Sequence, residues 1–207
     1  MPNVSPYNPL DKLHLAESIA RALLAGEAQP LAPQDAFDGA GLYAIYYFGG
    51  FPAYARIAQA NAEGDYGWPI YVGKAVPEGT RTATADGSTT RALCRRLREH
   101  QRSIVAADNL EIVHFVCRYL VVDPLWIPLG ESLLVGHYRP LWNVKVEGFG
   151  IHAPGGGRGA QRRSSWDTLH PGRTYAQGRP PNDRSQDEII RDTIHYLDQV
   201  EVPASLL

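Results

Sequence analysis

The chain has 207 residues, which fits one domain, and its 44% hydrophobic content is enough to supply a core. The formal net charge of −2 neither favours nor excludes nucleic acid, so the local distribution of charge matters more than its sum. The two cysteines have no metal-type spacing, and so few cysteines argue against a disulfide framework. The sequence shows no signal-peptide pattern and no run of roughly 20 apolar residues, which argues against secretion and a membrane span. We therefore expect a cytoplasmic protein.

The first half of the chain predicts one helix and two strands. Residues 11–26 have the spacing of an amphipathic helix that ends at glycine, and a proline-rich connector follows. Residues 42–48 and 69–75 read as strands, and the excursion between them is too long for a tight hairpin turn and has room for a short helix. Alternation in the first strand predicts Tyr43, Ile45 and Tyr47 on one face and Tyr46 on the other.

The second half predicts two helices around a third strand, followed by an arm and a last helix. Residues 91–105 and 126–138 are the helices, and 111–122 is the strand. Residues 148–182 are rich in glycine, arginine and proline without periodicity, so we expect an arm or long loop. Residues 183–200 return to a helical pattern.

These elements predict a single α+β domain with a small, three-stranded, mixed or antiparallel sheet flanked by helices. We divide it into four consecutive parts. They are an N-terminal helix with its connector (1–35), a core (36–147), the arm (148–182) and a C-terminal helix (183–207).

The helix at 91–105 carries five arginines in two different settings. Four of them fall opposite the apolar stripe, where a solvated surface and phosphate contact are about equally good interpretations. Arg96 and His100 are one helical turn apart and border the stripe, so both need partners at the edge of a core. A histidine in such a place is more often a satisfied core residue, but its pairing with Arg96 near a tyrosine-rich strand raises the case for function.

Glu131 lies in the first turn of the helix predicted at 126–138. A carboxylate there is favourable for the helix dipole alone. The functional interpretation is a hard oxygen ligand for a divalent cation such as Mg²⁺, which proteins often bind through one or two carboxylates together with substrate phosphate.

Taken in order, these residues resemble a known family. "GLY" at 41–43 and "YVG" at 71–73, followed by Arg96, His100, Glu131 and Asn143, are similar to the motifs of the GIY-YIG nucleases. The long separation of the two half-motifs, the phrase "RPLWNVKVEGFG" and the tail "HAPGGGRGAQRRSSWDTLHPGR" resemble one branch of that family. This branch contains the Type II restriction endonucleases that cut CCGCGG, and the similarity covers residues 36–176.

The resemblance implies Mg²⁺-dependent hydrolysis of DNA phosphodiesters. It implies that Glu131 holds the metal, that Tyr43 acts as general base or proton relay, and that Arg96 binds the scissile phosphate. A free tyrosine has a pKa near 10, so Tyr43 would need nearby cations or a hydrogen-bonded acceptor at neutral pH. His100 is a candidate acceptor for its proton. Further expected site residues are Lys74 as a positive charge, and Tyr71 and Asn143 as groups that orient phosphate or water.

The arm would find the DNA site. Its composition alone favours a solvated linker, whereas the resemblance favours a DNA-contacting role for Arg158, Gln161, Arg162 and Arg163. A palindromic target implies a homodimer on double-stranded DNA, acting in a restriction-modification defence system. The alternatives are another nuclease of the superfamily, for repair or homing, and a DNA-binding module without catalysis.

Overall fold

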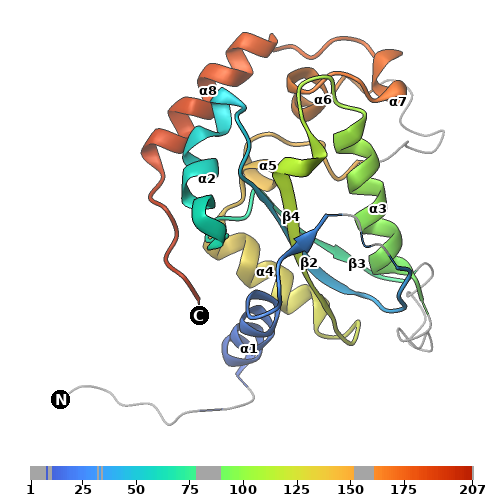
Figure 1. Cartoon of the computed structure of the whole chain (residues 1–207), viewed down its shortest axis with the longest axis vertical. Coiled ribbons are helices and arrows are strands. Elements are labelled where there is room, and N and C mark those ends of the chain that lie inside the picture. The colour runs from blue at the N-terminus through green and yellow to red at the C-terminus, as the bar shows by residue number, and fades with distance from the viewer. Residues whose placement is uncertain are drawn as a thin grey trace.

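A computed structural model of the chain describes residues 8, 11–31, 33, 35–77, 90–151 and 161–206. Its centre is an antiparallel sheet of four strands in the order β1-β4-β2-β3 (Figure 1). The strands are β1 (Gln29–Pro30), β2 (Gly41–Tyr47), β3 (Tyr71–Ala75) and β4 (Phe115–Val121). The fold is α+β, as the sequence predicts.

Strand β2 is buried along its whole length, because helices cover both faces of the sheet. The predicted alternation is confirmed: Tyr43, Ile45 and Tyr47 pack in one hydrophobic cluster, and Tyr46 packs in the other together with Leu42. The strand therefore separates two cores, and a one-residue slip of its register would exchange every side chain between them.

Different helices cover the two faces (Figure 1). Helices α1 (Lys12–Leu24) and α4 (Ile127–Tyr138) pack on the face of Tyr46. The other face carries α3 (Ala92–Val105), α5 (Leu141–Val144) and α8 (Gln186–Gln199). In the part of the chain that the structure describes, no helix combines the length and the apolar character needed to cross a bilayer.

The excursion between β2 and β3 contains the expected short helix, α2 (Ala55–Ala60), between the turns η1 (Pro52–Tyr54) and η2 (Ala62–Gly64). Asn61 fastens its ends. Its buried amide donates to the carbonyls of Tyr47 and Trp68 and accepts from the Trp68 N–H. The excursion therefore returns the chain to the sheet at a fixed point.

Three expectations about the elements need correction. The sheet has a fourth strand, because residues of the connector form β1 and pair with β4. The proline of β1 is tolerated there because β1 lies at the edge of the sheet. The predicted strand at 111–122 begins with a helical turn, η4 (Ile112–His114). The described part of 148–182 is no irregular arm, since it forms α6 (Ser165–Leu169) and α7 (Thr174–Gln177) and buries Trp166 and Leu169 in the core.

Candidate active site

Two glycines of the sheet explain why the half-motifs of the sequence contain glycine. A side chain on Gly73 would meet the Tyr43 phenol oxygen at 2.3 Å, so its absence leaves the space that the phenol occupies. A side chain on Gly41 would meet the Leu120 carbonyl oxygen at 1.9 Å, where β4 passes close to β2. Gly41 therefore allows the close approach of the two strands, and Gly73 makes room for the Tyr43 side chain.

Tyr43 and His100 form a buried pair beneath helix α3. The phenol oxygen lies 2.6 Å from His100 Nε2, and neither residue has exposed surface. Burial, reinforced by Tyr71, raises the pKa of Tyr43 well above its ordinary 10, although the Arg96 charge opposes this shift. The phenol therefore keeps its proton at neutral pH and shares a hydrogen bond with Nε2. The role of His100 as proton acceptor stays a prediction.

Arg96 and Tyr71 lie beside this pair. One Arg96 Nη donates to the Gly150 carbonyl at 2.8 Å, and the other is 3.2 Å from a Glu99 carboxylate oxygen. Burial alone would lower the pKa of Arg96, but Tyr43, Tyr71 and Glu99 outweigh it and leave the pKa raised, so the guanidinium stays charged. The Tyr71 ring packs edge-on to His100, with ring centroids 5.3 Å apart.

Lys74 and Glu131 lie at the other side of β3. Lys74 Nζ is 2.7 Å from Glu131 Oε2, so helix α4 and the end of β3 meet through an ion pair. A cleft of about 280 Å³ runs past this lysine to Arg96 and is also lined by Glu99. Burial raises the pKa of Tyr71, the Arg96 charge opposes that rise, and the Glu131 charge adds a small further increase.

Glu131, which contacts the cleft residue Lys74, is the carboxylate expected to hold a metal. The described residues contain no cluster of three or more His, Cys, Asp or Glu side chains that would hold an ion by themselves. Glu131 with its lysine partner fits Mg²⁺, which keeps most of its waters and uses one or two carboxylates plus substrate phosphate. Structural zinc or calcium, which require fuller protein cages, fit poorly.

Asn143 has a backbone partner on the sheet. Its Oδ1 accepts from the Val72 N–H at 2.9 Å, and its Nδ2 donates to the Val72 carbonyl at 2.8 Å. The amide thus holds the outer edge of β3, next to Tyr71 and Gly73. The expected role of Asn143 in orienting phosphate or water stays a prediction. The contact that the structure shows is its pair of hydrogen bonds to the Val72 backbone.

The sequence analysis missed the contribution of the segment 148–151. Phe149 stacks on the His100 ring with centroids 4.5 Å apart and planes at 16°, and the Gly150 carbonyl binds Arg96. Glu99 was also missed. A carboxylate three residues after Arg96 on one helix is a signal for a pair, but nothing in the local pattern connects 148–151 with a helix fifty positions earlier.

The structure describes three of the four proposed DNA-reading residues. Arg158 lies outside the described residues. Gln161 is exposed, and Arg162 forms an exposed ion pair with Asp183 at 3.1 Å. Arg163 donates its backbone N–H to the Pro180 carbonyl. Exposed pairs of this kind are weak and leave arginine available for other partners, so DNA contact by these residues stays a prediction.

Comparison with known proteins identifies one family. Residues 35–197, most of the chain, match the family described as the Eco29kI GIY-YIG domain. No match was found among curated proteins.

Proposed function

The chain belongs to the Eco29kI GIY-YIG domain family of restriction endonucleases, and on that premise we propose that it is a Type II site-specific, Mg²⁺-dependent endonuclease. The observation that carries the proposal is the buried Tyr43–His100 hydrogen bond beside the cleft that joins Lys74 to Arg96. This contact supports His100 as proton acceptor next to Arg96 as phosphate-binding group, and the Lys74–Glu131 ion pair supports a carboxylate near the same cleft.

The Tyr43–His100 pair acts as a proton relay in this proposal. With its raised pKa, the phenol is a poor base by itself at neutral pH. When water attacks phosphorus, Tyr43 takes the water proton and passes its own proton to His100 Nε2. The bond from phosphorus to the 3′ oxygen breaks, and the leaving oxygen takes a proton from solvent.

Arg96 and Glu131 stabilise the charge on the phosphate. The charged guanidinium of Arg96 offers parallel N–H donors to two phosphate oxygens, and Lys74 adds a second positive charge across the cleft. Glu131 would hold Mg²⁺, which supplies Lewis-acid stabilisation of the reacting phosphate. Glu131 would give up its Lys74 contact when it holds the metal, and Lys74 would then be available for phosphate.

The burial of Tyr43 requires a change on DNA binding. The phenol has no exposed surface in the free protein. The attacking water therefore reaches it only when neighbouring side chains move, as is common for catalytic groups whose geometry is completed by substrate.

The target proposed for the enzyme is the G/C-only palindrome CCGCGG, read with Gln161 and the arginines 158, 162 and 163. Arginine binds guanine O6 and N7 with two hydrogen bonds, which suits such a site. A palindrome is read by a two-fold symmetric protein, so a homodimer would bring one active site to each strand. A cytosine methyltransferase gene beside this one would support a role in restriction-modification defence.

Plasmid digestion tests the proposal. We expect the wild-type protein with Mg²⁺ to convert plasmid to discrete fragments, and EDTA to stop cleavage while leaving DNA binding measurable by mobility shift. Run-off sequencing of the ends then gives the site and the cut position. DNA binding without cleavage at any divalent metal concentration would contradict the nuclease proposal, and ends at many unrelated sequences would contradict site specificity.

A further inference from the structure

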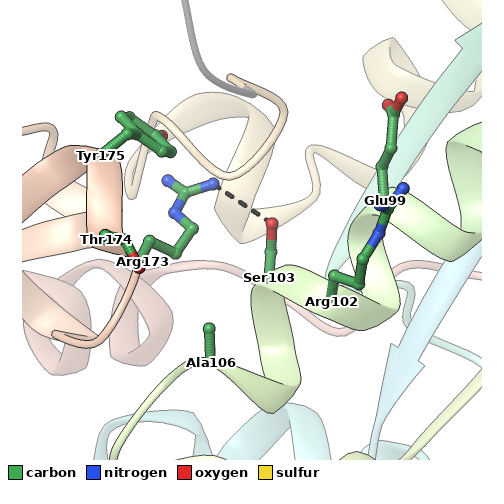
Figure 2. Close-up of a pocket in the computed structure, with 7 residues that line it drawn as sticks. All are labelled: Glu99, Arg102, Ser103, Ala106, Arg173, Thr174 and Tyr175. Atoms are coloured by element: carbon green, nitrogen blue, oxygen red, sulfur yellow. Dashed lines mark hydrogen bonds between the residues drawn. The ribbon is translucent and has the colours of Figure 1, made fainter.

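Arg173 is a buried arginine outside the residues that carry the proposed chemistry. It is 4% exposed and lies between the aromatic rings of Trp166 and Tyr175, with its guanidinium carbon 4.3 and 5.0 Å from their centroids. Its Nε donates to the Asp167 carboxylate at 2.7 Å. Figure 2 shows the guanidinium between Tyr175 and Ser103, at the wall of a hollow of about 450 Å³.

Apart from a long contact of 3.5 Å from Nη1 to the Ser103 hydroxyl on α3, the remaining donors of Arg173 hold one short segment of backbone. Nη1 donates to the carbonyls of Phe149 and Ile151 at 3.1 and 2.9 Å, and Nη2 donates to the Gly148 carbonyl at 3.0 Å. The Tyr175 hydroxyl adds a bond of 2.8 Å to the Ile151 carbonyl. Three carbonyls in four residues are therefore fixed by one side chain, whose own charge is balanced by Asp167.

That segment forms one wall of the candidate active site. Phe149 stacks on His100, and the Gly150 carbonyl accepts from Arg96. Space is tight there, because a side chain on Gly150 would lie 2.6 Å from the Tyr71 hydroxyl. A small shift of 148–151 would thus move the proton acceptor and the phosphate-binding group together.

We infer that Arg173, oriented by Asp167, is a positioning residue for the catalytic His100 and Arg96, acting through the segment 148–151. The inference rests on the proposed nuclease function. A displacement on the order of 1 Å in a site of this kind lowers turnover by up to about 100-fold. Lysine cannot replace Arg173, because it lacks the planar fork that reaches several carbonyls and the carboxylate at once.

The experiment measures single-turnover cleavage and DNA affinity for Arg173→Lys. We expect the cleavage rate to fall by about 10- to 100-fold, with the dissociation constant for DNA within about two-fold of wild type. Arg184→Lys is the matched control, since Arg184 binds Asp192 and Ser165 in the same region without contacting 148–151, and it should cleave at the wild-type rate.

A double-mutant cycle separates positioning from general stability. If Arg173 acts through Phe149, adding Arg173→Lys to Phe149→Leu slows cleavage little further, whereas independent effects would multiply. Multiplication of the two effects, or an unchanged rate in Arg173→Lys, would overturn the inference. If Arg173→Lys fails to fold, Tyr175→Phe replaces it in the same double-mutant cycle with Phe149→Leu. This substitution removes only the hydroxyl that binds the Ile151 carbonyl.

A second readout does not depend on cleavage. The stacked Phe149 ring shifts the NMR signals of the His100 ring protons, and Arg173→Lys should move these signals toward unstacked values while Arg184→Lys leaves them in place. A wild-type protein that cuts no DNA would contradict the proposed function alone. Unmoved His100 signals in a folded Arg173→Lys protein would contradict the positioning role alone.

Discussion

The phenol oxygen of Tyr43 lies in hydrogen-bond contact with Nε2 of His100, 57 residues away along the chain, at 2.6 Å in a site closed to solvent. Strand β2 brings the tyrosine and helix α3 brings the histidine, and Gly73 leaves the gap that the phenol fills. In the proposed mechanism, this pair allows proton transfer by a tyrosine whose raised pKa makes it a poor base on its own.

Tyr43→Phe should lower the cleavage rate by about 100- to 10,000-fold, because it removes the hydroxyl that relays the proton. DNA affinity should stay near wild type. Tyr46→Phe is the control, since Tyr46 is equally buried on the same strand but faces Arg118. Single-turnover kinetics check both, and full activity in a folded Tyr43→Phe protein would remove the phenol from the mechanism.

Glu131→Gln should lower Mg²⁺-dependent cleavage by about 100-fold or more, since the metal's contribution to transition-state charge stabilisation amounts to several kcal/mol. DNA binding in EDTA should be retained. Glu27→Gln, at an exposed carboxylate of the connector, serves as the control. The measurement is the rate as a function of Mg²⁺ concentration, and an unchanged curve for Glu131→Gln would show that the metal binds elsewhere.

Asn143→Ala should lower the free energy of unfolding by about 1–3 kcal/mol, because the N–H and carbonyl of the buried Val72 lose their partner. Asn182→Ala provides a matched comparison. Asn182 also bonds two backbone groups, but in a partly exposed loop where water can replace it, so its loss should be smaller. Urea unfolding measures both, and equal losses would refute the edge-clamp explanation.

The free energy of unfolding should decrease as the pH falls, because His170 is buried in its neutral form. Its Nε2 accepts from the Tyr54 hydroxyl at 2.5 Å, its Nδ1 donates to Asn109, and burial lowers its pKa from 6.5 to about 3. Below pH 6.5 the unfolded chain therefore binds a proton that the folded chain refuses. This one group should reduce stability by about 1.4 kcal/mol per pH unit as the pH falls from 6.5 toward 3.

Urea unfolding between pH 6.5 and 4.5 checks this slope against His170→Gln, which lacks the titrating group and should show a flatter dependence. The ring-proton NMR signals of His170 in the wild type should not titrate between pH 7 and 5. A titration midpoint near 6.5 would contradict the prediction.

Two protein chains should bind each duplex that carries the palindromic site. Sedimentation of the protein–DNA complex measures this stoichiometry directly. One chain per duplex, with double-strand cleavage retained, would contradict the homodimer proposal.

Periodicity in the sequence predicted the parts of the fold that depend on local pattern. The alternation in 42–48 gave both faces of β2, and the apolar stripe of 91–105 placed His100 at the core. It could not predict β1, since a two-residue strand with a proline is specified by its partner β4. The glycine- and arginine-rich composition after position 148 likewise concealed Trp166, which is buried by tertiary packing.

The candidate site was predictable where residues share one element, and not where distant segments meet. Helical spacing related Arg96 to His100. The backbone contact of Gly150 with Arg96 has no side-chain signal, because a carbonyl is present at every position. Arg173 reads as one more surface arginine until the three carbonyls and the carboxylate around it are seen.

The two outer strands of the sheet have an implication for assembly. At the β3 edge, Asn143 already occupies the N–H and the carbonyl of Val72, and at the other edge Pro30 has no N–H to offer. Another molecule therefore finds no open ladder to extend at these positions, which protects the chain from edge-to-edge aggregation.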